Sequence, residues 1–188
     1  TPRMCGIAGI VHVDGTPVAA ELVERMTRAI AHRGPDGDGH TVDGAVGLGN
    51  RRLAIIDLSP LGAMPMAADD GNVVITYNGE LYNFLELRHE LEQLGHSFRS
   101  RTDTEVVLRS YREWGERCVE RFNGMFAFAI HDRRRGEVLL ARDRYGIKPL
   151  YLTDVGGAVL FASEIKCFLA HPRFRVHPDR DQRHSDAR

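Results

Sequence analysis

Cysteine is scarce in this chain of 188 residues, with three copies at positions 5, 118 and 167. They form neither a closely spaced pair nor a C-x-x-C motif, so nothing indicates a disulfide-rich scaffold or a zinc ribbon, and we expect no metal site. Such cysteine use suits a reducing compartment, where thiols stay unpaired. We therefore expect a cytoplasmic protein.

Charge of one sign and long apolar runs are lacking as well. Lys and Arg number 25 against 26 Asp and Glu, a formal net charge of -1, so no general basicity points to nucleic acid or to an anionic membrane. The longest apolar stretches, such as MFAFAI at 125–130, fall far short of the roughly 20 residues that span a bilayer, and no signal peptide pattern opens the chain. The expected partner is a small molecule or another protein.

Strand and helix patterns fill most of the length. Apolar residues at helical spacing predict helices over about 17–30, 83–95 and 103–122, with Thr16 as a cap of the first and Gly115 breaking or kinking the third. Loops are predicted at HRGPDGDG, 32–39, and at NGELY, 78–82. Runs rich in Val, Ile and Phe predict strands at 5–13, 72–77, 125–132, 138–143, 151–153 and 158–163. The pattern favours an α+β fold in which helices cover two packed antiparallel sheets.

Three polar clusters stand at predicted strand ends or turns, where a rigid scaffold usually displays a site. They are Cys5 with Gly6, NRRLAIIDLS at 50–59 and NGE at 78–80. A cysteine thiol needs activation, because its ordinary pKa of about 8.5 leaves only a few per cent as thiolate at pH 7. Two activators are open: one of the nine histidines, or the α-amine of Cys5 itself if that residue becomes the first of the chain.

Each candidate also has a purely structural interpretation. Cys5 could be a small buried hydrophobe at a strand start. Of Arg51 and Arg52, which point to opposite faces of a strand, one is a solvated surface charge. Asp103 could cap the helix that follows it, and Asn78 with Gly79 is a common hairpin turn. Cys118 and Cys167 are expected to be thiols without a role.

Eight ordered sequence blocks over about residues 4–170 resemble the class II glutamine amidotransferase domain of the asparagine synthetase type. The blocks are MCGIAGI, HRGPDG, RRLAIIDLS, YNGELYN, TDTEVVL, FNGMFAFAI, RDRYGIKPLY and SEIK. The resemblance implies an N-terminal nucleophile hydrolase, a four-layer α/β/β/α sandwich of two antiparallel sheets. It also implies an enzyme that hydrolyses L-glutamine to L-glutamate and ammonia.

The resemblance further implies a role for each matching residue. Cys5 is the nucleophile that forms a thioester, and Asn78 and Gly79 form the oxyanion hole. Arg52 binds the substrate α-carboxylate, and Asp103 binds its α-ammonium, with Glu80 beside it. The backbone around Leu53 and Ile55 completes the pocket. One departure from relatives is Met64 in LGAMPM, where a Gln is common, and we expect it to affect only local loop contacts.

The resemblance also sets the expected organisation. Residues 1–4 are expected to be a leader or a misassigned start, 5–170 the amidotransferase domain, and 171–188 a linker or disordered tail. No cofactor is expected in this domain; ATP and Mg²⁺ belong to a synthetase domain that this sequence does not include. Expected partners are L-glutamine and a synthetase domain or subunit that receives ammonia, and a homodimer is an open alternative. The rival interpretation is a non-catalytic domain that binds glutamine or docks on a partner.

Overall fold

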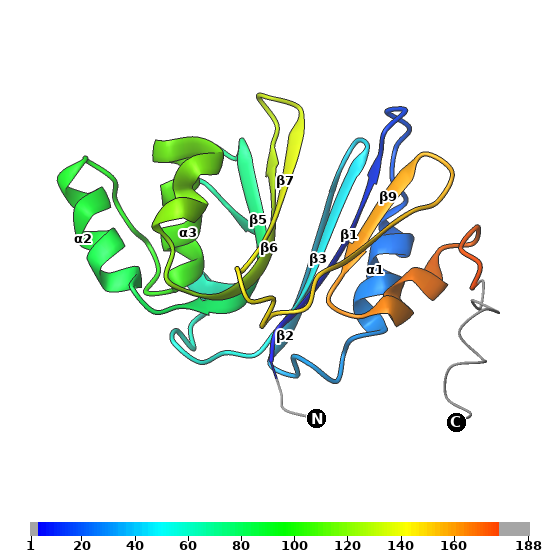
Figure 1. Cartoon of the computed structure of the whole chain (residues 1–188), viewed down its shortest axis with the longest axis horizontal. Helices are drawn as coiled ribbons and strands as arrows, with labels where there is room; N and C mark the ends of the chain where they lie inside the picture. Colours follow the sequence, from blue (N-terminus) through cyan, green and yellow to red (C-terminus); the bar gives the residue numbers. More distant parts are fainter. Residues whose placement is uncertain (1–3, 177–188) are drawn as a thin grey trace, which may run out of the picture.

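The computed structural model describes residues 4–176 and shows two antiparallel sheets packed face to face between helices. Helix α1 (Ala20–Arg28) covers the outer face of the five-stranded sheet, and α2 (Phe84–Gln93) and α3 (Asp103–Trp114) cover the outer face of the four-stranded sheet (Figure 1). This is the four-layer α+β sandwich that the sequence predicts.

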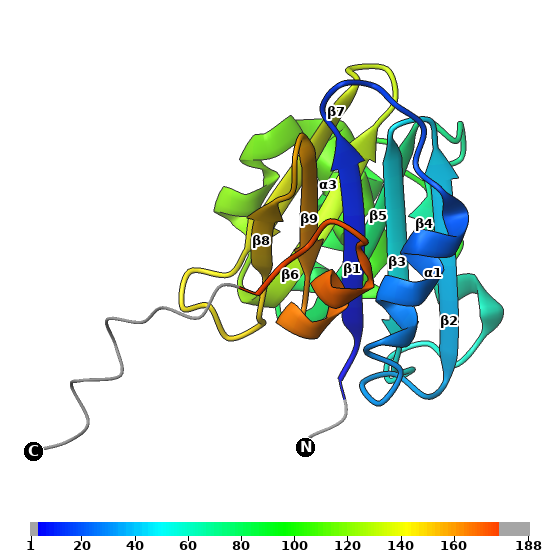
Figure 2. The same cartoon turned by 90° about the vertical axis from the view of Figure 1, so that its right-hand side faces the viewer.

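The five-stranded sheet contains the N-terminal strand near its centre. Figure 2 views this sheet with α1 in front of it. Its strands, in order across the sheet, are β2 (Gly37–Asp43), β3 (Val46–Arg52), β1 (Gly6–His12), β9 (Ala158–Ala162) and β8 (Tyr151–Asp154). Because β1 pairs with both β3 and β9, the residue just before it, Cys5, is held at the edge of a rigid layer.

In the four-stranded sheet, large and small side chains alternate between the two faces, and this alternation explains how the sheet packs. In order across the sheet its strands are β4 (Met66–Ala67), β5 (Val73–Leu81), β6 (Gly124–Asp132) and β7 (Glu137–Arg142). On β6, Phe128 and Ile130 belong to the core beneath α2 and α3, whereas Ala129 belongs to the layer between the sheets. Small residues on one face thus let the two sheets approach, while large residues on the other meet the helices.

The layer between the sheets combines apolar packing with a polar bridge. Leu48 of β3 and Phe161 of β9 pack against Val74 and Ala129 of the opposite sheet. Beside them Asn50 of β3 donates through Nδ2 to the Thr76 hydroxyl at 3.2 Å and to the Tyr77 carbonyl at 3.1 Å, both on β5. The two sheets are therefore joined close to Cys5, which precedes β1, and to Asn78, which follows Tyr77 in β5.

The first helix begins later than its sequence pattern predicts. It starts at Ala20 with Ala19 as its N-cap, and Thr16 is not the cap. The Thr16 hydroxyl donates to Asp14 at 2.8 Å instead, and its backbone N–H also bonds that carboxylate. The local turn at Asp14 therefore competes successfully for the hydroxyl. The apolar stripe was correct, because Leu22, Met26 and Ile30 are all buried.

The second and third helices match their patterns more closely. Gly95 follows the end of α2 with φ +94°, which suits glycine after a helix C-terminus. Gly115 has φ +63° and ends α3, and a 3₁₀ helix, Gly115–Arg121, continues the chain. Two shorter 3₁₀ helices span Pro60–Gly62 and Ile165–Ala170.

Strand β2 was not predicted, and of β3 (Val46–Arg52) only Arg51 and Arg52 were assigned to a strand; the loop predicted at 32–39 gives way to β2 at Gly37. Both strands are rich in glycine, which weakens any strand pattern. The structure explains the glycines of β3, because a Cβ at Gly49 would lie 2.0 Å from the Thr27 hydroxyl of α1. Glycine here lets the helix lie directly on the sheet.

The domain boundaries at 1–4, 5–170 and 171–188 stay predictions. The structure describes Met4 and residues 171–176, and the remainder of both end segments lies outside the described residues. Within them, His171 is buried and Phe174 packs on Phe168 with ring centroids 5.7 Å apart. The last described residues therefore contact the outer face of the five-stranded sheet's core.

Candidate active site

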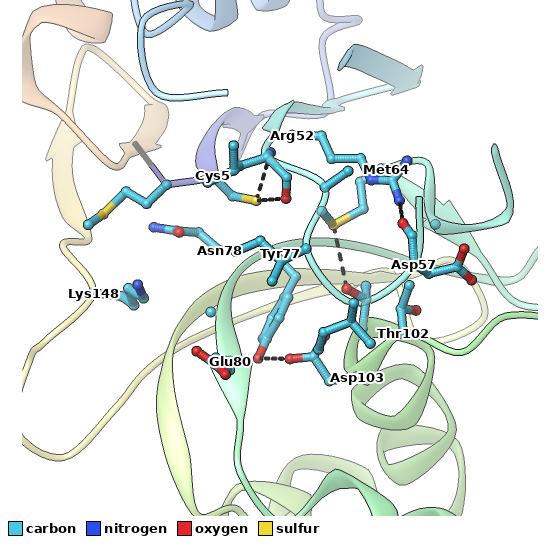
Figure 3. A pocket seen from close by; sticks show the side chains of 18 of the residues that line it. Cys5, Arg52, Asp57, Met64, Tyr77, Asn78, Glu80, Thr102, Asp103 and Lys148 are labelled. Atoms are coloured by element: carbon cyan, nitrogen blue, oxygen red, sulfur yellow. Dashed lines mark hydrogen bonds between the residues drawn. The ribbon is translucent and has the colours of Figure 1, made fainter. Parts of the chain in front are cut away.

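A cavity of about 220 Å³ opens where the ends of the two sheets meet. Figure 3 shows Cys5 on one side, Tyr77 and Asp103 on the opposite side, and Asn78 with Lys148 at one end. The structure places all eight sequence-predicted site residues in its lining: Cys5, Arg52, Leu53, Ile55, Asn78, Gly79, Glu80 and Asp103. Residues separated by about a hundred positions in the chain thus share one cavity.

The Cys5 thiol is half-buried and fixed by one neighbour. Its Sγ accepts the Leu53 backbone N–H at 3.2 Å and lies 3.6 Å from the Leu53 carbonyl, to which the thiol donates. Burial raises the pKa of this thiol, whereas the Leu53 N–H and the positive charges of Lys148 and Arg52 oppose that rise. The resting state is accordingly a thiol, and a reaction through its sulfur requires a base.

The two adjacent arginines of β3 take opposite directions, as the strand alternation predicts. Arg52 lines the cavity, and its guanidinium donates to the backbone carbonyls of Asp57 and Ser59, the latter at 3.2 Å. Arg51 instead lies 3.4 Å from the Asp38 carboxylate and 3.4 Å from the Thr27 carbonyl. Arg52 is therefore the guanidinium of this strand that faces the cavity.

Asn78 and Gly79 do not form the predicted turn. They lie inside strand β5, opposite Ala127 and Phe126 of β6, and the chain turns only after Leu81. The error arises because NGE matches a hairpin turn locally, while pairing with the long strand β6 keeps the segment extended.

The Asn78 side chain is 1% exposed, and its Nδ2 has no hydrogen-bond partner among residues 4–176. A buried donor without a partner costs about 1–3 kcal/mol of stability, so this amide is a candidate ligand contact. At Gly79, a Cβ would lie 2.6 Å from the Met125 carbonyl, so only glycine fits there without a shift of the backbone. Both residues thus present donors at the cavity wall.

Asp103 is the first residue of α3, and Thr102 rather than Asp103 caps the helix, its hydroxyl accepting the Glu105 N–H at 3.2 Å. Asp103 Oδ2 instead accepts the Tyr77 hydroxyl and the Leu81 N–H, each at 2.9 Å. Burial raises the pKa of the Asp103 carboxyl, and these two hydrogen bonds work against the rise. The Asp103 carboxyl group is therefore held in the cavity lining by Tyr77 and Leu81.

The remaining predicted residues form the rim. The Glu80 side chain is exposed at the cavity edge, and Ile55 is 71% exposed in the loop after β3. The Leu53 backbone N–H donates to the Cys5 sulfur, and the predicted contribution of the Leu53 and Ile55 backbone to substrate binding stays a prediction.

No functional role was predicted from the sequence for several residues that lie in or beside the cavity. Tyr77 and Lys148 were quoted within the YNGELYN and RDRYGIKPLY blocks without a role, and only the fold shows that they line the cavity. Met64 was expected to affect loop contacts alone, but it is buried in the lining, with Sδ 3.8 Å from the Thr104 hydroxyl. Arg33 of the HRGPDG block donates to the Cys5 carbonyl at 2.9 Å. Its signal was the block itself, since no local pattern connects positions 33 and 5.

The fold matches those of two solved structures. The glutamine phosphoribosylpyrophosphate amidotransferase from Bacillus subtilis superposes with a TM-score of 0.76 at 22% sequence identity, covering 88% of this chain and 43% of that one. A structure described as the allosteric regulatory enzyme of purine biosynthesis gives 0.73, also at 22% identity. At this identity the likeness concerns the fold alone.

The sequence comparisons define the family. The chain belongs to the glutamine amidotransferase domain family, whose model matches residues 4–185. It is 44% identical to the glutamine-hydrolyzing asparagine synthetase 3 of Bacillus subtilis over 94% of this chain. It is 41% identical to the putative glutamine-hydrolyzing asparagine synthetase 2 of Methanocaldococcus jannaschii over 89% of this chain, and 39% identical to the amidase chry2 of Gibberella zeae over 95%. The resemblance inferred from the eight blocks is confirmed.

The chain spans only a fraction of each relative's length: 29% of the Bacillus protein, 35% of the Methanocaldococcus protein and 29% of the Gibberella protein. It therefore matches the amidotransferase portion of longer proteins. Within residues 4–176, no helix has the length and apolar character needed to cross a membrane.

Proposed function

We propose that this domain hydrolyses L-glutamine to L-glutamate and ammonia through a thioester on Cys5. The observation that carries the proposal is the Asn78 Nδ2, a buried donor without a protein partner that lines the same cavity as the Cys5 thiol. An amide donor held in place beside a nucleophile is what a tetrahedral oxyanion requires.

The chemistry balances with groups of the cavity, water and the amine of Cys5. After the thiol loses its proton, Sγ attacks the side-chain amide carbon of glutamine, and the negative charge moves to the amide oxygen beside Asn78 Nδ2 and the Gly79 N–H. The C–N bond then breaks, and the nitrogen takes up the proton and leaves as ammonia. Water attacks the thioester, the C–S bond breaks, and glutamate leaves while the thiol regains a proton.

The proposed base is the α-amine of Cys5, which exists only when the Met4–Cys5 bond has been cut. An ordinary α-amine has a pKa of about 7.7–8.0, so roughly a tenth is neutral at pH 7 and able to accept a proton. The Cys5 nitrogen of the present chain is an amide without useful basicity. Met4 contributes one backbone hydrogen bond, from its N–H to the Arg33 carbonyl at 3.1 Å, and lies before the first strand, so its removal leaves both sheets intact.

Recognition of free glutamine is assigned to two opposite charges. The Arg52 guanidinium is proposed to bind the α-carboxylate, exchanging one of its contacts with the loop carbonyls of Asp57 and Ser59. Asp103 is proposed to bind the α-ammonium, assisted by Glu80 and by the backbone near Leu53 and Ile55. The pair selects an amino-acid head group over a glutamine side chain within a peptide.

Ammonia is proposed to pass to a synthetase domain or subunit. The support is that relatives over this region are named glutamine-hydrolyzing asparagine synthetases and are about three times longer than the chain. ATP and Mg²⁺ would act there, with no cofactor in this domain. The acceptor would be aspartate or another carboxylate, and a relative named as an amidase shows that the domain occurs in differently named proteins.

The test is glutamate release by a chain that begins at Cys5, with its mass checked. Expression from Met4 supplies this chain when the initiator Met is removed. We expect turnover from that chain and none from residues 1–188 or from Cys5→Ala in the shortened background. Turnover that survives Cys5→Ala would overturn the assignment, and a silent Cys5-first chain that still binds glutamine would favour the non-catalytic binding domain.

A further inference from the structure

One buried guanidinium beside the nucleophile has no part in the mechanism above. Arg33 is 8% exposed and lies in the loop after α1. Its Nε donates to the Cys5 carbonyl at 2.9 Å, and its own carbonyl accepts the Met4 N–H at 3.1 Å. Arg33 therefore holds the backbone on both sides of the Met4–Cys5 bond.

Glu164 holds the guanidinium from the other side. Arg33 Nη1 lies 3.0 Å from Glu164 Oε1, in the SEIK block that follows β9. The same carboxylate lies 2.9 Å from His32 Nε2 and 3.0 Å from Lys166 Nζ. Burial alone would raise the pKa of Glu164, but the hydrogen bonds from Lys166 and Arg33 lower it, so the carboxylate is ionised at neutral pH. Two distant sequence blocks, HRGPDG and SEIK, thus meet at the nucleophile.

The neighbouring strand makes room for this side chain. A Cβ at Gly6 would lie 2.9 Å from Arg33 Cδ, so the glycine after the nucleophile allows the arginine to cross β1. Arg33 Nη2 is buried without a partner within the described residues 4–176. Burying a guanidinium nitrogen without a hydrogen-bond partner destabilises the folded protein, and an exposed lysine or a buried apolar side chain at this position would not have that cost.

We propose that Arg33, oriented by Glu164, is a positioning residue that fixes the Cys5 backbone and makes the Cys5 α-amine a weaker base, and this rests on the proposed function. The α-amine and the carbonyl belong to the same residue, so a cation bonded to the carbonyl oxygen lies within a few ångströms of the amine. A nearby positive charge disfavours the protonated amine, so more of it is neutral and able to accept the thiol proton near pH 7. Glu164 acts in the opposite direction, and the balance sets the amine's pKa.

Other charges also face the nucleophile. The side chains that carry them are the same in the parent and in the Arg33 and Glu164 variants. The charges of Asp103, Lys148 and Arg52 act on the pKa of the Cys5 thiol. The charges of Arg33, Glu80 and Asp143 act on the pKa of Lys148. Tyr77 lies opposite Cys5 across the cavity, and His32 and Lys166 pair with Glu164.

The test uses the Cys5-first chain and the pH dependence of kcat/KM. Activity rises with pH as the amine loses its proton, so the midpoint of this acid limb reports the amine's pKa. Arg33→Gln removes the positive charge and is expected to move the limb to higher pH; Glu164→Gln is expected to move it to lower pH. Below the limb, each unit of movement changes kcat/KM about tenfold. Loss of packing alone would not move the two limbs in opposite directions.

Two further variants separate charge from geometry. Arg33→Lys keeps the charge but cannot bond the Cys5 carbonyl and Glu164 as a planar fork does, so we expect a limb near that of the parent and a lower plateau of kcat. Arg28→Gln, an exposed arginine of α1 paired with Glu24, is the matched control and should change neither.

Titration of the Cys5 amine by nitrogen NMR, in protein labelled at cysteine, gives the same comparison without turnover. The inference would be overturned if Arg33→Gln and Glu164→Gln still release glutamate but their acid limbs move in the same direction or do not move. The proposed function would then still stand. If Arg33→Gln does not fold, Glu164→Gln and Arg33→Lys decide alone. A Cys5-first parent without glutaminase activity would count against the proposed function, and the amine titration would then decide this inference.

Discussion

Tyr77 and Asp103 share a hydrogen bond of 2.9 Å that joins the four-stranded sheet to the first turn of α3. The phenol donates and the carboxylate accepts, and the burial of Tyr77 together with the negative charge of Asp103 raises the pKa of Tyr77 well above its usual value. The proton therefore stays on the phenol, and the Tyr77 hydroxyl and the Leu81 N–H both bond Oδ2 of Asp103.

Tyr77→Phe is expected to weaken glutamine binding, more strongly in acid. A hydrogen bond to a charged group is worth about 1.5–3 kcal/mol, so KM should rise about tenfold or more. Asp103 binds an ammonium only when ionised, and burial already raises its pKa. Binding is thus lost as pH falls through that raised pKa. Because the Tyr77 bond lowers the pKa, its removal should start the loss at a higher pH. Measuring KM against pH tests this, and parallel curves for both proteins would contradict it.

Asn78→Ala should reduce kcat by about 100- to 1,000-fold, because a donor to the developing oxyanion is lost. KM should change little, since the interaction forms mainly in the transition state. The variant should also be at least as stable as its parent, because the buried Nδ2 has no protein partner to lose. Steady-state kinetics and urea unfolding check both parts. A rise in KM at constant kcat would instead make Asn78 a ground-state binding residue.

Arg52→Ala and Arg51→Ala form a matched pair on one strand. We expect the first to raise KM about 30-fold or more, since a charge-assisted contact to the carboxylate is lost. The second changes a side chain bonded to Asp38 on the other face and should leave kinetics near those of the parent. Equal effects of the two substitutions would argue against the assignment to Arg52.

Asp143 predicts a pH-dependent loss of stability near the cavity. Burial alone would raise its pKa, but backbone N–H groups of Lys148, Ile147, Phe126 and Tyr145 outweigh this and lower it. A lowered folded pKa contributes stability that is complete above the ordinary value of about 3.9 and is lost as pH falls through the folded pKa.

Urea unfolding should therefore show that the free energy of unfolding of the parent is lower at about pH 3 than at about pH 6. Asp143→Asn should be less stable than the parent at pH 6 and should lose less stability between the two pH values. Asp154→Asn, which changes an exposed carboxylate of β8, is the control and should keep the parent's pH dependence. An unchanged pH dependence in Asp143→Asn would contradict the prediction.

The elements that the sequence predicted well are those with one dominant periodicity. Apolar patterning alone predicts strand β1, helices α2 and α3, and the β8–β9 hairpin. The order of these elements, together with the resemblance, predicts the sandwich. Strands β2 and β3 were missed because glycine replaces the side chains that would reveal them. The β3 glycines are explained by α1 packing on the sheet, whereas a Cβ at Gly39 of β2 would lie 2.3 Å from the Met64 carbonyl oxygen. Asn78 and Gly79 were mistaken for a turn because strand pairing over nine residues overrides a two-residue turn signal.

The site shows a similar division. Every residue that the resemblance supplied lines the cavity, while their catalytic and binding roles stay predictions. Tyr77, Lys148 and Arg33 could not be found from local pattern, because each acts across the fold: Tyr77 on Asp103, Lys148 on the thiol, and Arg33 on the Cys5 carbonyl. Contacts between positions so far apart depend on how the sheets stack, which no short window of sequence encodes.

The packed layer between the sheets also sets the distance between site residues on the two sheets. Cys5 extends one sheet and Asn78 belongs to the other, so the packing of Leu48, Val74, Ala129 and Phe161 helps to set the gap between the Cys5 thiol and the Asn78 amide. Adding a methyl group at Ala129 would move the reacting groups apart without touching either. Such a change is expected to lower the proposed turnover in a folded protein whose cavity residues are all present. The thickness of the interior thus limits substitution in this domain as much as the cavity does.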